Sequence, residues 1–432
     1  MRRVVMKKPR FVKCIAMLCT MALMLSNTVV YAQSTSKEKV DLTIKTEQQL
    51  RNFFSDMAKG NAYAGKLIKL AKDIEVDSYS GNKWVLNSET NIAFEGTFDG
   101  AGHTISGINA GETSRTDQMA GLFGTIAKTG TVENLNIAES AFVSKDRSFA
   151  MIAGNNKGKI SNCHIKSSRI YNEIWPGGIA VTNYGIIEDC TAEVDIDFCA
   201  YTAGGICNNN YGKIVNCAFG GSFRDYVFDK KANSYIAVTA GDIAASNVGM
   251  ISNCFSYGKA VLTNEKSRHY AICGYTDPYK STLKNCYYSE EISDGAYNSF
   301  QGTIVNVDNC TLEEMQTDRL VDKLNQTRGT SLAWHLGADS AYPVHVGVSE
   351  VRFKSLANKK GYIKSSKSYA ADGEAVKLTV KLNKGYKLKS ISVKTTSGEK
   401  VALKKVKTGI YTFKMPDKGV VVATTVKQKG KK

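Results

Sequence analysis

The sequence predicts an all-β protein, built as a parallel β-helix with a small β-rich domain after it. Two observations point to the β-helix. A four-residue motif, aliphatic-polar-Asn-Cys in its best copies, occurs eight times between residues 100 and 312, in steps of about 27 residues. The strand-like stretches between turn residues are four to six residues long and rich in Ile and Val, which leaves no room for helices. A fixed period of this size is typical of coils that bury their apolar faces against neighbouring coils.

The spacing inside the motif predicts a corner in each coil. Ile160 and Cys163 are three residues apart, so a straight strand would direct them to opposite faces. Both point inward if Asn162 adopts the left-handed conformation, and stacked amides about 4.8 Å apart could then hydrogen-bond as a ladder. The eight copies are Ile105–Ile108, Val132–Leu135, Ile160–Cys163, Ile187–Cys190, Ile214–Cys217, Ile251–Cys254, Leu283–Cys286 and Val307–Cys310. The predicted ladder positions are Asn134, Asn162, Asp189, Asn216, Asn253, Asn285 and Asn309.

A second element, N-x-G, precedes the best copies. Glycine adopts positive φ freely and Asn tolerates the left-handed region, so we expect a turn with these conformations at each N-x-G. The four pairs are Asn156/Gly158, Asn183/Gly185, Asn210/Gly212 and Asn247/Gly249.

The cysteines of the motif form a column in the expected coil stack. Leu135 and Ile108 occupy the same motif position, which indicates a core position, where buried Cys behaves as a small hydrophobe. We therefore expect free thiols, although adjacent coils would also permit disulfides. No C-x-x-C pair is present and the cysteines come one per coil, so no metal is expected, and no Walker or dinucleotide motif indicates a cofactor. The column comprises Cys163, Cys190, Cys217, Cys254 and Cys286, with Cys310 in the last copy.

The chain resembles the GLUG repeats of secreted bacterial surface proteins. The resemblance rests on FEGTFDGAGHTISGI, AGLFG and the G-x-I-x-N-[LC] copies, and it covers roughly residues 41 to 348. It implies a right-handed parallel β-helix with a capping helix at Glu47–Lys59, but it does not imply one activity. The expected domains are a signal peptide (1–32), an N-terminal cap with first strands (33–92), a GLUG-type β-helix with a C-terminal capping helix at 311–326 (93–348), a basic β-rich module (350–427) and a basic tail (428–432).

The N-terminus has the pattern of a secretory signal. Six basic residues precede an apolar run from Cys14 to Leu25, and Val30-Tyr31-Ala32 fits a cleavage site after Ala32. The run is too short to cross a bilayer comfortably. We therefore expect a secreted protein without a membrane span, released or held non-covalently at the cell surface.

Positive charge is concentrated in the last module. Residues 350–432 contain 22 basic and 5 acidic residues, a net charge of +17, whereas residues 33–349 carry −6. Period-2 alternation in AVKLTVKL predicts a strand with one buried face and lysines outside. The module resembles the internalin B-repeat of Gram-positive surface proteins, through GEAVKLTV, GYKLKSISV and YTFKMP. We expect either a solvated lysine face or attraction to an anionic polymer.

Catalytic motifs are scarce in this sequence. None of the five His residues forms an H-E-x-x-H pair, which excludes that class of metallopeptidase. Polysaccharide lyases and hydrolases on β-helices use paired carboxylates. The candidates for such a pair are Glu188, Glu193, Asp195 and Asp197, but no facing acid is expected in the next coil. We assign no catalytic residue.

Exposed aromatic residues are better candidates for binding. Tyr171 and Trp175 form one cluster, and Tyr226 and Tyr235 lie in a step that is ten residues longer than the step before it. Aromatic side chains on protruding loops suit sugar or protein contacts. We expect a non-enzymatic, adhesion-type binding protein whose partner is a cell-wall polymer, a glycan or a host protein, and not nucleic acid. The alternatives are a polysaccharide lyase or glycoside hydrolase, and a structural part of a surface assembly.

Overall fold

The computed structural model describes the chain between residues 39 and 428. The predicted signal peptide and its cleavage site lie outside the described residues, and so do Tyr226 and Tyr235. The internal ranges left undescribed are 78–83, 85, 89–91, 113–118, 145–147, 173, 199–200, 226–236, 277–279, 299–301, 330–331, 337–340, 346–347, 354–359, 366–368, 372–374, 396–397 and 417–419.

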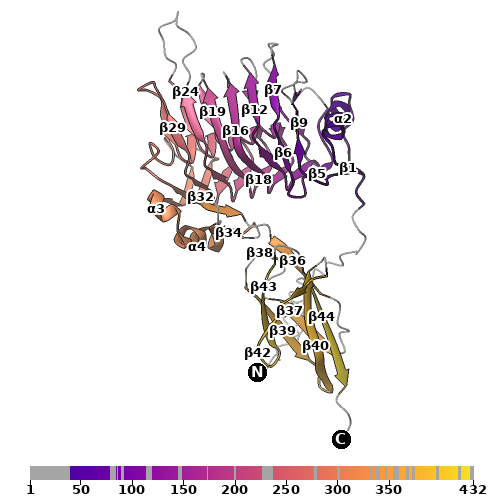
Figure 1. Ribbon diagram of the computed structural model, residues 1–432. Coiled ribbons are helices and arrows are strands. Elements are labelled where there is room, and N and C mark those ends of the chain that lie inside the picture. The colour runs from indigo at the N-terminus through magenta and orange to yellow at the C-terminus, as the bar shows by residue number, and fades with distance from the viewer. Residues whose placement is uncertain are drawn as a thin grey trace, which may run out of the picture. The chain divides into compact units, whose positions relative to one another are not determined.

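The predicted fold class is confirmed: the chain forms a parallel β-solenoid of about seven turns, followed by small β-rich sheets (Figure 1). Each coil contributes strands to one large sheet. Its strands are β1 Leu42–Ile44, β2 Leu67–Leu70, β3 Ile74–Glu75, β5 Thr97–Asp99, β6 Thr104–Ser106, β7 Asn109–Glu112, β10 Thr131–Glu133, β11 Asn136–Ala138, β12 Ala141–Ser144, β15 Lys159–Ser161, β16 His164–Asn172, β18 Ile186–Glu188, β19 Thr191–Phe198, β22 Lys213–Val215, β23 Ala218–Phe219, β24 Ser222–Asp225, β27 Met250–Ser252, β28 Phe255–Ser256, β29 Lys259–Val261, β32 Thr282–Tyr288 and β33 Thr303–Asn309.

Smaller sheets close the remaining sides of the coils. One consists of β9 Phe123–Ile126, β14 Ala153–Asn156, β17 Ala180–Asn183, β21 Cys207–Asn210, β26 Ala244–Asn247 and β31 Cys273–Thr276. Two more consist of β4 Asn87–Ser88, β8 Met119–Gly121 and β13 Ser148–Phe149, and of β20 Thr202–Gly204, β25 Thr239–Gly241 and β30 Arg268–Tyr270.

The corner of each coil is formed by a residue in the left-handed region. Ile160 lies opposite Ile187 in the neighbouring coil, and both are fully buried. Asn162 has a φ of 50° and donates through Nδ2 to Asn134 Oδ1 at 2.8 Å. The corner residues with positive φ are Asn134, Asn162, Asp189, Asn216, Asn253, Asn285 and Asn306.

The first and last motif copies do not lie in this column. In the final coil Asn306 has a φ of 51° and donates to Asn285 Oδ1, whereas Asn309 is exposed and accepts from the Glu290 amide. The prediction for Asn309 was wrong because the strand pairing is shifted by three residues, which puts Val307 opposite Cys286.

The first copy is displaced as well, by seven residues, because Val132 pairs with Phe98. Ile105 pairs with Ile137 and not with Val132, so Ile108 does not belong to the cysteine column. Leu135 does belong to it, because the Val132 strand pairs with the Ile160 strand in register. The shared four-letter pattern is therefore genuine in six copies and coincidental in two.

The N-x-G elements differ from their predicted turn geometry. Neither their Asn nor their Gly residues are among the positions with positive φ. Instead, the asparagines are buried and form a second amide ladder, in which Asn183 Nδ2 donates to Asn210 Oδ1 at 2.8 Å and Asn210 Nδ2 donates to Asn247 Oδ1 at 2.7 Å. The glycines stack so closely that a Cβ atom on Gly212 would lie 2.1 Å from the carbonyl oxygen of Gly185. Close backbone approach, not positive φ, requires glycine here.

A helix closes the N-terminal end of the solenoid, as predicted. Helix α2 (Glu47–Ala58) begins after Thr46, whose side chain accepts a hydrogen bond from the Gln49 amide at 3.2 Å. Its buried face inserts Phe53 between aromatic rings of the first coils, 5.5 Å from Phe98 and 6.1 Å from Phe94 between ring centroids. These rings fill the end of the apolar interior.

The C-terminal helices pack on the side of the solenoid. The predicted helix at 311–326 is divided into α3 (Leu312–Met315) and α4 (Asp318–Thr327), followed by the hairpin of β34 (Trp334–Leu336) and β35 (Pro343–His345). Their apolar side chains cover the outward column of Ala218, Phe255 and Tyr287. Ile304 in the last coil is 40% exposed. These helices therefore support a lateral face and do not cover Ile304 at the last coil.

The C-terminal module consists of two sheets. One contains β38 Tyr369–Ala371, β36 Val348–Phe353, β44 Val420–Gln428, β40 Tyr386–Thr395 and β41 Lys400–Val401. The other contains β37 Gly361–Ser365, β39 Ala375–Leu382, β43 Ile410–Lys414 and β42 Lys404–Lys407. Alternate residues of β39 enter a shared core, as the period-2 pattern predicts. The core residues are Val376, Leu378, Val393, Phe413, Met415, Val420 and Val422.

The cysteine column lies in the solenoid interior. All five predicted members are fully buried, and each thiol lies within hydrogen-bonding distance of the carbonyl oxygen two residues earlier, as in Cys217 to Val215 at 3.2 Å. Eight cysteines in the described part of the chain are free. Burial raises the pKa of the Cys163 and Cys217 thiols, which disfavours the reactive thiolate.

We expect these thiols to resist alkylation in the folded protein. Unfolding in urea without reductant should expose at least eight reactive thiols, because the eight described cysteines are free and buried in the folded protein. The measurement is a colorimetric thiol count before and after unfolding. Finding one thiol or none in the unfolded, unreduced sample would show that adjacent coils are cross-linked.

Candidate binding surface

The described aromatic candidates lie on the outside of the solenoid. Tyr171 is half-buried on β16, between Val143 and Asp197 of the neighbouring coils. Trp175 lies beyond the end of β16 and is 46% exposed. Both side chains are therefore accessible for contact, and Trp175 presents the larger apolar surface.

Sequence reasoning missed a second aromatic pair. Tyr184 and Tyr211 occupy the middle of successive N-x-G elements and are 54% and 49% exposed. Their rings stack with centroids 5.0 Å apart and an interplanar angle of 10°. The sequence signal for this pair was the occurrence of two N-Y-G tripeptides one period apart. It was overlooked because N-x-G was interpreted only as a turn.

The four carboxylates considered for catalysis are engaged in contacts between coils. Asp197 accepts from Arg169 Nε at 2.9 Å and lies opposite Arg224, while Asp195 accepts from Ser222 Oγ at 2.5 Å. In the same way, Glu188 pairs with Lys159 at 2.8 Å, and Glu193 accepts from the Tyr257 hydroxyl at 3.0 Å. These contacts join one coil to another, so the four carboxylates have a structural role.

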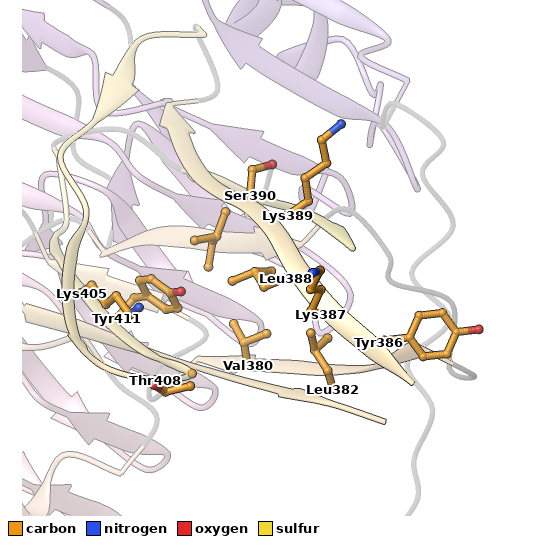
Figure 2. Close-up of a pocket in the computed structure, with 12 residues that line it drawn as sticks. Val380, Leu382, Tyr386, Lys387, Leu388, Lys389, Ser390, Lys405, Thr408 and Tyr411 are labelled. Atoms are coloured by element: carbon orange, nitrogen blue, oxygen red, sulfur yellow. The ribbon is translucent and has the colours of Figure 1, made fainter. Parts of the chain in front are cut away.

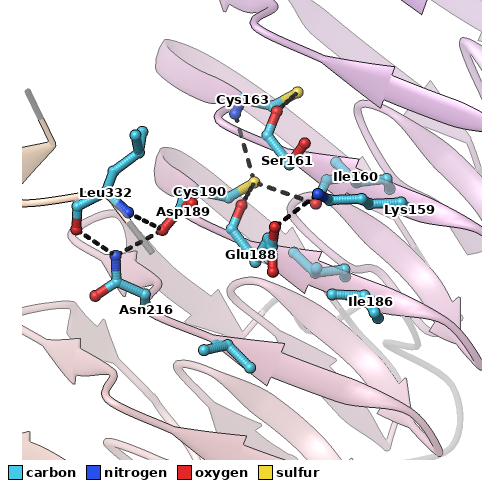
Figure 3. A network of polar contacts seen from close by, with 12 residues as sticks. Lys159, Ile160, Ser161, Cys163, Ile186, Glu188, Asp189, Cys190, Asn216 and Leu332 are labelled. Carbon is cyan, nitrogen blue, oxygen red and sulfur yellow. Dashed lines mark hydrogen bonds and ion pairs between the residues drawn. The ribbon is translucent and has the colours of Figure 1, made fainter. Parts of the chain in front are cut away.

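A buried polar network joins the corner ladder to the C-terminal hairpin and to Leu332 just before it; Figure 3 shows the contacts among Asp189, Asn216 and Leu332. Asp189 Oδ1 accepts from Asn216 Nδ2 at 2.6 Å and from the Leu332 amide at 3.0 Å. Asn216 Oδ1 accepts from the Trp334 indole, whereas Asn216 Nδ2, which donates to Asp189, also lies 3.2 Å from His345 Nε2. Burial lowers the pKa of His345 well below its usual value, so its ring is neutral. Burial also raises the pKa of Asp189 to about 6.

Asp189 destabilises this network when it is ionised, because burial disfavours its charged form. Since its folded pKa lies above its unfolded value, the folded state binds the extra proton between about pH 4 and 6, and stability falls as pH rises through this window. We expect Asp189→Asn to stabilise the protein by about 1–3 kcal/mol at pH 7.5 and by much less at pH 4. Urea unfolding of both proteins at the two pH values is the measurement. An equal difference at both would contradict the assignment.

A second buried group contains Ser256, Asp242 and His269. The Asp242 carboxylate accepts from the Ser256 hydroxyl and lies 2.7 Å from His269 Nε2. Burial opposes protonation of His269, but the adjacent Asp242 carboxylate outweighs it and raises the pKa of the imidazole. The serine contacts the carboxylate and not the imidazole, and all three side chains are buried. The arrangement lacks the serine–imidazole contact of a hydrolase.

The C-terminal module presents lysines around an open cleft (Figure 2). All four residues of β42 are exposed, three of them lysines. The cleft has a volume of about 630 Å³ and lies between β39 and β43 of one sheet and β40 of the other. Val380, Leu382 and Leu388 are directed into it, and Lys387, Lys389 and Lys405 lie along its lining.

Comparisons with known proteins identify no family for this chain. No protein-family model matches it. A segment is 29% identical over 115 residues to Halomucin of Haloquadratum walsbyi, and this match covers 25% of the chain and 1% of Halomucin. A crystal structure from Bacteroides ovatus, named a "putative immunoglobulin A1 protease", is 18% identical with a TM-score of 0.47, covering 70% of this chain and 91% of that one.

Two further properties concern the described residues alone. No helix among them is both long and apolar enough to cross a membrane. Within the same part of the chain, no group of three or more His, Cys, Asp or Glu side chains is arranged to hold a metal ion.

Proposed function

We propose that the protein is a non-enzymatic binding protein that acts outside the cell or at its surface. In this proposal the solenoid is a rigid scaffold of the GLUG type, and the C-terminal module, of the internalin B-repeat type, attaches to an anionic polymer. The observation that carries the proposal is the exposed lysine array of the module. Its strands place apolar residues in the core and lysines in solvent, so the charge is available to a polymer.

The solenoid supports the same proposal through its charge and its contacts. Its net charge of −6 would be repelled by a polyanion, which leaves attachment to the module. Its candidate catalytic carboxylates are held in contacts between coils, whereas Trp175, Tyr184 and Tyr211 are exposed. Exposed aromatic rings on a rigid frame suit a glycan or protein partner.

Truncation after Gly347 tests the attachment. We expect the full protein to be retained on washed cell walls or on a polyanion column and to elute with salt, because this attraction is screened over about 8 Å at physiological ionic strength. The truncated protein should flow through while still unfolding cooperatively. Equal retention of both proteins, or retention that salt does not alter, would leave the lysines as a solvated face.

A further inference from the structure

The core of the C-terminal module is closed at one end and open at the other. Along β39, the inward residues Val376 and Leu378 are fully buried, whereas Val380 is 9% exposed and Leu382 is half-buried. Across the interior, β40 shows the same gradient, from Val393 at 1% exposure to partly exposed Ile391 and Leu388. Apolar residues thus continue to alternate toward the interior at the end of the module where the two sheets no longer bury them completely. Exposure of this apolar surface to water is unfavourable, and a bound ligand can remove it from water.

Two β-bulges lie at the open end, one in each sheet. The register of β40 against β44 shifts between Leu388 and Ser390, and that of β42 against β43 shifts between Lys405 and Lys407. A bulge bends its strand and redirects side chains, and bulges are frequent beside binding sites. Both bulges involve residues that line the cleft, and they bend the strands there. Its volume of about 630 Å³ falls within the range of small-molecule pockets.

The lining of the cleft is cationic. Lys387, Lys389 and Lys405 are exposed, and within the described residues none of the three has a carboxylate partner. Among the described residues that line the cleft, none is acidic. A ligand with an apolar body and one anionic group would therefore find complementary surfaces for both of its parts.

We propose that this cleft binds a single-chain anionic amphiphile, such as a fatty-acid carboxylate, taken from solution. The hydrocarbon chain lies between the sheets against Val380, Leu382 and Leu388, and the anionic head lies among Lys387 and the two lysines at the bulges. This site goes beyond attachment to a polymer, because a polymer needs only the exposed lysines and not the apolar cleft.

Calorimetric titration of the mature full-length chain with decanoate and dodecanoate, below the concentration at which they form micelles, tests the proposal. We expect one saturable site, with affinity rising about fourfold per methylene group. Dodecyltrimethylammonium, which has the same chain and a cationic head, should bind at least about tenfold more weakly, a difference of 1.4 kcal/mol. Acetate should not bind. The absence of a saturable site, or equal affinity for both head charges, would overturn the proposal.

Two sets of substitutions of equal charge locate the site. Replacing Lys387, Lys389 and Lys405 with Gln removes the cleft lysines, whereas replacing Lys394, Lys400 and Lys414 removes three exposed lysines at the closed end. We expect the first set to weaken dodecanoate binding about tenfold or more and the second to leave it unchanged. Retention on a polyanion should decrease equally in both, so the polymer and amphiphile proposals can fail independently.

The substitution Leu388→Asp provides a second localisation. It introduces a carboxylate into the apolar lining and should abolish dodecanoate binding while thermal unfolding stays cooperative. Unchanged dodecanoate affinity in this variant, or an equal loss in the closed-end lysine variant, would show that the amphiphile binds elsewhere and would overturn the proposal.

Discussion

Gly212→Ala is expected to destabilise the solenoid by about 3 kcal/mol or more, at or above the usual cost of overpacking. The new methyl group would lie 2.1 Å from the carbonyl oxygen of Gly185, and that glycine is held in the same way against Gly158. Relief would require the coils to separate, which would break the parallel strand pairing on both sides of the substitution. Urea and thermal unfolding, followed by circular dichroism, measure the effect.

Gly111→Ala is the matched control. It also lies in a strand of the solenoid, but the nearest atom to its new methyl group would be 3.4 Å away, an ordinary contact. Its stability should remain within about 1 kcal/mol of the parent, because reduced freedom in the unfolded chain favours alanine slightly. A similar loss of stability in both variants would mean that strand propensity, and not close stacking of the backbone, is the reason for glycine at these positions.

Asn210→Leu is the second large effect we expect, at about 2–6 kcal/mol. The substitution preserves bulk but leaves one N–H of Asn183 and the Oδ1 of Asn247 without their partners in the buried interior. Each unsatisfied buried polar group costs about 1–3 kcal/mol. The free energy of unfolding in urea is the quantity to compare.

Asn209→Leu serves as the control because it is adjacent in β21 but lies outside the buried ladder and is partly exposed. A surface change of this kind should alter stability by no more than about 0.5 kcal/mol. If Asn210→Leu were as mild as Asn209→Leu, the amide ladder would contribute little to the stacking of coils.

The corner of the coil could be predicted because its signal is local. Three-residue spacing between two apolar positions, with Asn between them, has few backbone solutions, and the structure adopts the expected one at Asn162. The capping helix was expected from the family resemblance and not from a local signal, and the structure has it at Glu47–Ala58.

Other features depend on contacts between coils, which cannot be predicted from the local sequence pattern. Asn-x-Gly reads as a turn, yet the same residues satisfy two demands of a stacked solenoid, an inward amide and a backbone without Cβ. The Val307–Cys310 copy matches the motif better than Ile304–Val307, but strand pairing selects the latter. The lysine pattern predicted an outward charged face, whereas the cleft between strands of different sheets and its two bulges had no sequence signal.

The buried asparagine ladder also separates coil length from coil spacing. The amide contact between Asn183 and Asn210 spans 27 residues at 2.8 Å, and that between Asn210 and Asn247 spans 37 residues at 2.7 Å. Ten additional residues thus leave the rise from one coil to the next unchanged. Segments between ladder positions are free to lengthen and diverge while the frame keeps its pitch. The scaffold can therefore acquire new surface by insertion while the contacts of its core stay the same.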